Sequence, residues 1–184
     1  DTADCFFSDL RVRIENLLGE EGAGFKQLMT QLSQERLIQA IRGVASAQAA
    51  LQWTLDYVAE RQMFGHTLAD FQNTQFELAA MHAELTSQRV FVDRCIELHM
   101  RGEFDSTDAA AAKLVTTDRQ CEVMDRCLQL FGGWGYMWEY PIARAFADAR
   151  MCRIGGGSSE TMKQIIGKSL FKPSAGKAAG HAKA

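Results

Sequence analysis

The sequence has little proline and no long apolar run. Only two prolines, Pro141 and Pro173, occur in 184 residues, so few positions are closed to a helix. No segment approaches the roughly 20 apolar residues that a membrane-spanning helix needs, and the first residues are not typical of a signal or transit peptide. We therefore expect long helices and no membrane span.

A strong net charge and a cysteine framework are also absent. The balance of 20 Lys+Arg against 23 Asp+Glu leaves a net charge of -3 and no basic surface for a nucleic-acid backbone. The 5 cysteines form no C-x-x-C pair, and the 4 histidines have no metal-ligand spacing. We expect no nucleic-acid partner, no metal and a reducing intracellular compartment. With 47% hydrophobic residues, the chain is typical of one globular domain.

Apolar residues recur every three or four positions, as one face of a helix requires. From Glu35 onward they fall at Leu37, Ile41, Val44, Ala47, Leu51, Leu55 and Val58. Further helices are predicted for about residues 71–100, 107–131, 142–149 and 159–171, with Arg101-Gly102 ending the first of these. Three long antiparallel helices with short turns predict an all-α fold, a four-helix up-down bundle.

The two ends of the chain differ from this pattern. Cys5–Val12 is strand-like and is followed by a polar, glycine-containing connection, so we expect a short N-terminal strand remnant. Residues 172–184 are small and basic without periodicity, which predicts a disordered tail. The predicted division is a strand and linker over 1–22, the helical bundle over 23–171 and the tail over 172–184.

Two stretches could carry chemistry. The run Gly155-Gly-Gly-Ser-Ser159 precedes a helix, so its N–H groups could face a ligand oxygen; an ordinary inter-helix loop with an N-cap is the commoner use of such a stretch. Glu35 and Arg36 lie at the expected start of the first long helix, where an acid usually only complements the helix dipole. Residues 132–135 lack the spacing of a dinucleotide-binding loop.

Four segments, in their order and spacing, resemble the acyl-CoA dehydrogenase family over about residues 6–171. They are Glu60-Arg-Gln-Met-Phe-Gly65 with Gln72, Gln129-Leu-Phe-Gly-Gly-Trp-Gly-Tyr136, Glu139-Tyr-Pro-Ile-Ala-Arg-Ala-Phe-Ala-Asp-Ala-Arg150 and Ile154-Gly-Gly-Gly-Ser-Ser-Glu160. Residues 132–141 look most like the long-chain members.

The resemblance implies a partial enzyme. Family members have an N-terminal helical domain, a middle β domain and a C-terminal four-helix bundle, and this chain resembles only the last β-strand and the bundle. The implied reaction is FAD-dependent α,β-dehydrogenation of long-chain acyl-CoA in fatty-acid β-oxidation. The implied partners are acyl-CoA, further copies in a tetramer or dimer, and electron-transfer flavoprotein as acceptor. The implied location is the cytoplasm in a bacterium or the mitochondrial matrix in a eukaryote.

The resemblance also assigns site residues. The positions that match FAD contacts are Arg61, Phe64, Gln72, Gln129, Leu130, Phe131, Gly132, Gly133, Ser158, Ser159 and Glu160. Most members place the catalytic base in a Tyr-Glu-Gly-Thr loop, but Gly156 stands at the Glu position here. Long-chain and isovaleryl-type members place the base just before an Arg on the first long helix, which matches Glu35. The matching substrate contacts are Ser33, Arg36, Gly156 and Gly157.

Two other functions stay open at this stage. One is a non-catalytic helical module, or a partner subunit that completes the FAD site of a neighbour. The other is an acyl-CoA oxidase, which would pass electrons to oxygen. For the separate 184-residue chain we expect no turnover, because the β domain that would hold the flavin ring has no counterpart in it.

Overall fold

The computed structural model describes residues 3–171, which contain five α-helices and a sheet of two very short strands. The elements are η1 (Ile14–Asn16), α1 (Gly24–Glu60), β1 (Gln62–Met63), β2 (His66–Thr67), η2 (Leu68–Asp70), α2 (Gln72–Met100), α3 (Ser106–Phe131), η3 (Gly132–Tyr136), α4 (Pro141–Cys152) and α5 (Ser159–Leu170). The predicted all-α class is confirmed. The chain divides into two compact units, residues 1–31 and 32–184, and the division falls inside α1.

The first unit has little regular structure before α1. The strand predicted for Cys5–Val12 is not formed, and its side chains are exposed. A β-strand needs a neighbouring strand for its hydrogen bonds, and residues 3–31 provide none. The side chain of Gln27 donates a hydrogen bond to the Leu18 carbonyl over 2.9 Å, which ties the connection to the first turns of α1.

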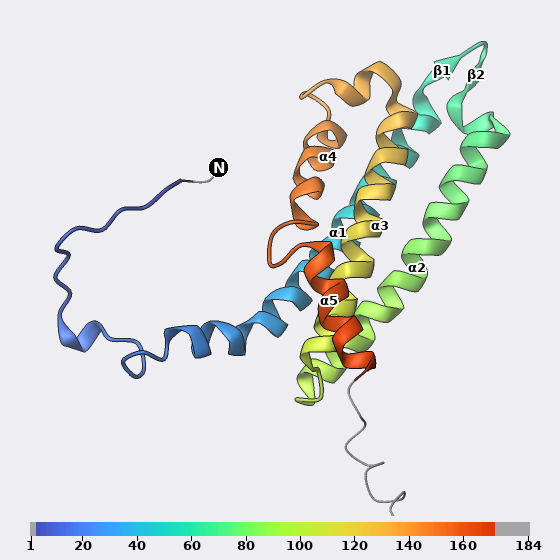
Figure 1. Cartoon of the computed structure of the whole chain (residues 1–184). Helices are drawn as coiled ribbons and strands as arrows, with labels where there is room; N and C mark the ends of the chain where they lie inside the picture. Colours follow the sequence, from blue (N-terminus) through green and yellow to red (C-terminus); the bar gives the residue numbers. More distant parts are fainter. Residues whose placement is uncertain (1–2, 172–184) are drawn as a thin grey trace, which may run out of the picture. The chain divides into compact units, whose positions relative to one another are not determined.

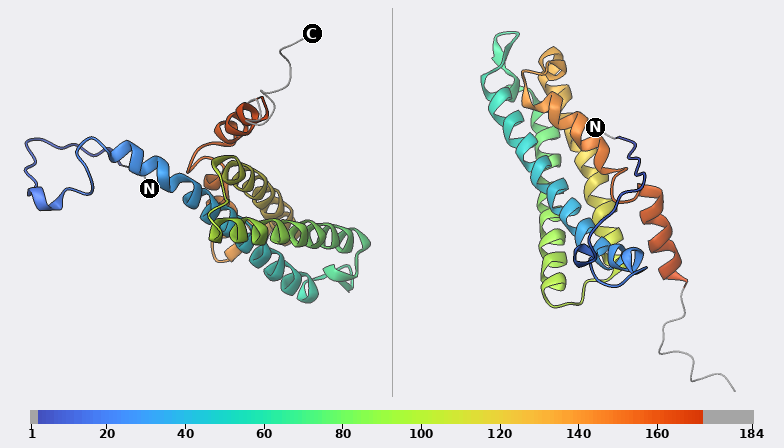
Figure 2. Two further views of the ribbon diagram at one scale, coloured as in Figure 1. Left: turned by 90° about the horizontal axis from the view of Figure 1, so that it is seen from below. Right: turned by 90° about the vertical axis from the view of Figure 1, so that its left-hand side faces the viewer.

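In the second unit the helices pack around α3. α4 and α5 both pack against α3, and α2 runs beside it (Figures 1 and 2). One core cluster combines residues from four helices: Ala47, Ala50, Leu51, Met81, Leu85, Val123, Met124, Cys127, Phe131, Ile142 and Ala149. A second cluster contains Leu37, Ala40, Val44, Val92, Cys95 and Ala112. Of the apolar stripe predicted from Glu35 onward, most residues are buried, whereas Ile41 and Leu55 are exposed.

Small residues let these helices approach closely. Ala109, Ala110 and Ala112 of α3 are fully buried. A Cβ added to Gly43 of α1 would lie 3.3 Å from the Thr116 carbonyl of α3, closer than most such contacts. The close approach of α1 and α3 in this unit brings Arg36 of α1 to the loop between α4 and α5.

The boundary of α1 differs most from the prediction. The helix begins at Gly24, whereas the apolar stripe predicted a start near Glu35. Within the added turns, the Thr30 hydroxyl donates to the Lys26 carbonyl over 2.9 Å. Phe25, Leu28 and Met29 of these first turns have the i, i+3, i+4 spacing of a helix face, but in the structure their side chains are exposed.

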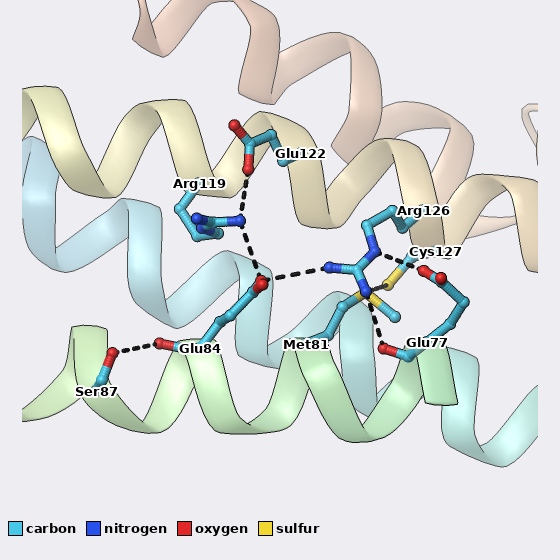
Figure 3. A network of polar contacts seen from close by, with 8 residues as sticks. All are labelled: Glu77, Met81, Glu84, Ser87, Arg119, Glu122, Arg126 and Cys127. Carbon is cyan, nitrogen blue, oxygen red and sulfur yellow. Dashed lines mark hydrogen bonds and ion pairs between the residues drawn. The ribbon is translucent and has the colours of Figure 1, made fainter. Parts of the chain in front are cut away.

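A polar network joins α2 and α3 on one side of the bundle (Figure 3). Arg126 of α3 contacts the Glu77 carboxylate over 2.7 Å and the Glu84 carboxylate over 3.3 Å. It also donates to the Glu77 backbone carbonyl over 3.2 Å. Arg119 joins Glu84 to Glu122. These contacts fix the two helices in one register beside the apolar core.

A tight hairpin, which the sequence did not predict, connects α1 to α2. β1 and β2 pair antiparallel through Gln62 with Thr67 and Met63 with His66. The turn residues Phe64 and Gly65 have φ values of 53° and 84°, and two consecutive positive values match the twist of a two-residue hairpin.

The structure also bears on membrane-spanning helices and metal-binding clusters. No helix of the described part of the chain is long and apolar enough to cross a membrane. Within residues 3–171 no group of three or more His, Cys, Asp or Glu side chains is arranged to hold a metal ion. The tail predicted to be disordered, residues 172–184, lies outside the described residues.

Candidate functional site

The glycine-rich loop between α4 and α5 has a backbone that only glycine adopts readily. Gly156 and Gly157 have φ values of 66° and 103°. These values lie in the left-handed region, where a Cβ crowds the neighbouring backbone, so glycine is favoured at both positions. The loop packs beside Lys113 in the N-terminal half of α3 and beside Arg36 of α1.

The structure brings Glu35 to this loop. A Cβ built on Gly156 would lie 3.7 Å from Oε1 of Glu35 and 3.6 Å from Cε of Lys113. The carboxylate is therefore beside the position where a side chain at 156 would begin. In the described residues Glu35 is exposed, with no ion-pair partner within 4.0 Å.

Arg36 reaches the same loop from the buried face of α1. Its side chain is 7% exposed, and Nε donates to the Gly156 carbonyl at 3.5 Å, the long limit of a hydrogen bond. Burial lowers the pKa of this guanidinium, and the adjacent Glu35 carboxylate acts in the opposite direction. Ser33 lies one turn earlier on the same face of α1 and is half-buried.

The sequence reasoning missed Lys113, a lysine on the buried face of α3. The residue is completely buried, and Nζ donates to the Gly157 carbonyl over 2.6 Å. Burial lowers the pKa of Lys113, with a further lowering by Arg36; Cys152, Asp118 and Glu35 raise it. A signal existed in the sequence, because Lys113 lies in the apolar run Ala109-Ala-Ala-Ala-Lys-Leu-Val115.

A second anchor holds the two ends of the loop. Asp118 of α3 forms an ion pair with Arg153 over 2.7 Å and accepts the Ser159 hydroxyl over 3.2 Å. The Ser159 N–H donates to the Arg153 carbonyl. The Gly156 and Gly157 carbonyls thus accept hydrogen bonds from the protein. The Gly156 and Gly157 N–H groups, in contrast, donate to no protein atom within residues 3–171. Two such donors can bind a ligand oxygen.

The predicted FAD contacts Ser158–Glu160 form the N-terminus of α5. Ser158 is the N-cap, and its hydroxyl accepts the Thr161 N–H over 3.4 Å. Hydrogen bonds from its own N–H and from Ser158 lower the pKa of Glu160, which is exposed. The Ser159 side chain is already bonded to Asp118, so its hydroxyl is largely used within the protein.

A cavity of about 610 Å³ lies at the opposite end of α3. Its wall contains five of the predicted FAD positions in one continuous stretch, Gln129 to Gly133, and Arg61. The other lining residues are Tyr57, Met63, Leu68, Trp134 and Met137. This volume falls in the range of about 300–1,000 Å³ typical of ligand sites.

Aromatic rings shape the cavity wall. The Tyr57 and Phe131 rings stack with centroids 4.2 Å apart, and the Tyr57 hydroxyl donates to the Phe131 carbonyl over 3.3 Å. Tyr140 meets both rings edge-on. Burial raises the pKa of Tyr57, and nearby Arg61 lowers it, so the phenol stays a neutral donor at neutral pH.

Arg61 gives this cavity its charge. The Leu68 N–H donates to the Arg61 carbonyl over 2.8 Å, which fixes the backbone of Arg61 at the base of the hairpin. Arg61 is exposed, and no carboxylate of residues 3–171 lies within 4.0 Å of its guanidinium. Phe64 and Gln72 are exposed and do not line the cavity.

Comparison with known proteins identifies the family. Residues 22–171 match the family described as "Acyl-CoA dehydrogenase, C-terminal domain". The chain belongs to this family. It is 43% identical over 174 residues to the long-chain specific acyl-CoA dehydrogenase, mitochondrial, of Rattus norvegicus. That match covers 95% of this chain and 40% of the rat enzyme, so the chain spans about two fifths of this curated relative.

Solved structures agree with this assignment. An acyl-CoA dehydrogenase from Geobacillus kaustophilus is 44% identical, with a TM-score of 0.86 over 91% of this chain and 44% of that one. A chain in a structure described as the electron transferring flavoprotein of Acidaminococcus fermentans is 34% identical, with a TM-score of 0.84 over 91% of this chain and 44% of that one. The all-α bundle of this chain thus matches the C-terminal helical domain of the acyl-CoA dehydrogenase family.

Proposed function

We propose that this chain is the C-terminal part of an FAD-dependent acyl-CoA dehydrogenase that uses Glu35 as its catalytic base. The observation that carries the proposal is the position of Glu35 Oε1, 3.7 Å from where a Cβ of Gly156 would lie. The Glu35 carboxylate thus lies beside Gly156, the loop position at which most family members have the catalytic Glu. The likeness to long-chain enzymes supports acyl-CoA thioesters with long chains as substrates.

The reaction needs a base and a polarised carbonyl. A proton α to a thioester is too weakly acidic for a carboxylate in water, so hydrogen bonds must stabilise the enolate oxygen as charge develops. In our proposal a carboxylate oxygen of Glu35 takes the α proton, and the N–H of Gly156 donates to the thioester oxygen. Arg36, Ser33 and Gly157 line the substrate.

The exposure of Glu35 has a consequence for this assignment. A carboxylate in water keeps its hydration shell and is a weak base towards carbon, and a site closed to water removes that shell. The described residues leave Glu35 exposed. We therefore expect water to be excluded from Glu35 by the bound acyl-CoA and by the remaining domains of the full-length protein.

The cavity around Arg61 fits part of a dinucleotide. Its wall is largely apolar and aromatic, which suits a flat ring system, and its one guanidinium suits a pyrophosphate. When bound, FAD supplies the acceptor for the hydride that leaves the β carbon. Arg61 and the backbone of Gln129–Gly133 would hold it here. Arg61, together with Phe64 and Gln72 outside this cavity, would contact FAD bound to a neighbouring subunit. Ser158–Glu160, which also lie outside this cavity, would make further FAD contacts.

Assembly and electron transfer are parts of the same proposal. α1 exposes large apolar side chains after Gln31, including Ile38 and Trp53, and these suit contact with further copies in a tetramer or dimer. The likeness to a chain of an electron transferring flavoprotein structure supports such a flavoprotein as electron acceptor. Residence in the mitochondrial matrix, or in the cytoplasm of a bacterium, agrees with the relatives.

The test is reduction of bound flavin by acyl-CoA in the full-length protein, followed by absorbance without oxygen. Glu35→Gln is expected to slow reduction by roughly 10²–10⁴-fold, the usual contribution of a general base. Glu103→Gln, which changes an exposed acid between α2 and α3, is the matched control. A Glu35→Gln protein that reduces at the wild-type rate, or a full-length protein that binds no FAD, contradicts the proposal.

A further inference from the structure

Lys113 is a buried cation with few partners. Its ammonium has three donors, and within residues 3–171 only the Gly157 carbonyl accepts from it. No carboxylate of the described chain lies within 4.0 Å of Nζ. Burying an ammonium with such incomplete pairing is unfavourable, so stability alone does not account for a lysine at this position.

Lys113 bonds to the part of the loop whose backbone can reorient most easily. Gly155, Gly156 and Gly157 lack side chains, and glycine backbones reorient more easily than those of other residues. Rotation of one peptide plane by half a turn exchanges the positions of its carbonyl and its N–H, since the peptide unit is planar. A flip of the Gly156–Gly157 plane, whose carbonyl accepts from Arg36, would replace the Gly157 N–H by an acceptor where an oxyanion needs a donor. The bond from Lys113 holds the next plane, Gly157–Ser158, and so limits the rotation of its neighbour.

Cations hold the two carbonyls on the C-terminal side of the candidate oxyanion donor. Arg36 donates to the Gly156 carbonyl at 3.5 Å, and Lys113 donates to the Gly157 carbonyl at 2.6 Å. On the N-terminal side, the Gly155 N–H donates to the Met151 carbonyl over 2.9 Å. The bond from Lys113 is the shortest of the three and carries a full charge, so it contributes most to fixing the loop.

Lys113 also forms the floor beneath Gly156. Its Cε lies 3.6 Å from the Cβ position of Gly156, and Oε1 of Glu35 lies 3.7 Å from that same point. A single side chain therefore contacts the loop at Gly157 and packs where the carboxylate of Glu35 meets Gly156. A change in this side chain alters the loop and the approach of the base together.

We propose that Lys113 is a positioning residue, which holds the Gly156–Gly157 backbone so that its N–H groups and the Glu35 carboxylate face the same substrate. The proposal rests on the proposed function for the role of Glu35. It assigns to α3 a direct part in the site, although α3 itself contributes no group that touches substrate.

The first experiment observes the loop itself in the 184-residue chain. Amide hydrogen exchange and ¹⁵N spectra of residues 155–159 are compared for wild type, Lys113→Met and Lys113→Arg. Lys113→Met, of similar length but without a donor, is expected to exchange the Ser159 N–H at least tenfold faster and to broaden the glycine signals. Lys168→Met, at an exposed lysine of α5, is the control and leaves them unchanged. Unchanged exchange in Lys113→Met overturns the proposal.

The second experiment separates positioning from a structural role. In the full-length protein, Lys113→Met is expected to lower kcat at least tenfold with KM changed less than threefold, and Lys113→Arg to regain part of kcat. The urea midpoint of Lys113→Met should equal or exceed that of wild type, because an apolar side chain suits a buried position. A lowered midpoint with kcat unchanged assigns Lys113 a structural role and overturns the proposal.

The two proposals fail in different ways. If Glu35→Gln keeps the wild-type rate, the proposed function is contradicted, and the exchange experiment still decides whether Lys113 holds the loop. If Glu35→Gln loses activity but Lys113→Met keeps both kcat and the exchange of the loop amides, only the role of Lys113 is contradicted.

Discussion

Gly135 allows a close contact between η3 and the end of α3, and an added methyl group tests this packing. Gly135 is buried, and its Cβ would lie 2.5 Å from the Leu128 carbonyl oxygen. It would also lie 3.1 Å from Cγ of Leu128 and 3.1 Å from Cβ of Phe131. Side-chain Cβ atoms essentially never come within 3.0 Å of another atom, so η3 or α3 must shift.

The magnitude follows from what must move. Overpacking a well-packed interior costs about 1–3 kcal/mol, and the upper half applies here because the nearest obstacle is backbone. We therefore expect Gly135→Ala to lower the free energy of unfolding by about 2–3 kcal/mol. The same shift would move Phe131 and Trp134, which line the cavity proposed for FAD.

The assay is urea unfolding of the 184-residue chain, with the midpoint and slope fitted together. Gly133→Ala is the matched control, since nothing lies within 4 Å of its Cβ position and its φ is not positive. It should shift the free energy of unfolding by about 0.5 kcal/mol or less. Equal midpoints for the two variants would refute the packing described for η3.

Three further predictions concern the helix interface, the buried lysine and the core. Arg126→Met should lower the free energy of unfolding, measured in urea, by about 1–2 kcal/mol, because it removes the ion pair with Glu77 and a hydrogen bond to the Glu77 backbone. Arg89→Met, which breaks an exposed i,i+4 ion pair, is the control and should cost about 0.5 kcal/mol or less. The pKa of Lys113 is lowered by burial, so its contribution to stability is fully present above the unfolded pKa of 10.5 and is lost as pH falls through the folded pKa. The stability of wild type relative to Lys113→Met should therefore rise with pH in this window, by at most about 1.4 kcal/mol per pH unit, and a flat difference would contradict the burial of Lys113. Met81→Ala should cost about 2–5 kcal/mol, since Met81 is fully buried in the larger core cluster, and a cost below about 1 kcal/mol would contradict its place there.

Periodicity was sufficient for most of the fold. The start predicted near residue 107 agrees with α3, which begins at Ser106 with Asp105 accepting the Thr107 and Asp108 N–H groups. The first turns of α1 were missed although Phe25, Leu28 and Met29 have helical spacing, because the apolar stripe was followed only from Glu35 onward. The hairpin was missed because strands of two residues have no alternation to detect.

The site shows a sharper limit. Glu35 and Gly156 are distant in sequence, and no local pattern relates them, so only the family resemblance placed them together. The resemblance did not indicate Lys113, because a lysine in a helix is usually solvated and its burial depends on α5 and the loop that precedes it. Asp118 was missed for the same reason, since its partners Arg153 and Ser159 come from another part of the chain.

The central claim is that Glu35 takes the α proton of an acyl-CoA. Exchange of that proton for deuterium in heavy water, measured on the full-length protein with a bound acyl-CoA, reports this step apart from hydride transfer. Our account predicts that Glu35→Gln lowers the exchange rate by roughly 10²–10⁴-fold, while Glu103→Gln exchanges at the wild-type rate. Exchange by Glu35→Gln at the wild-type rate would contradict it.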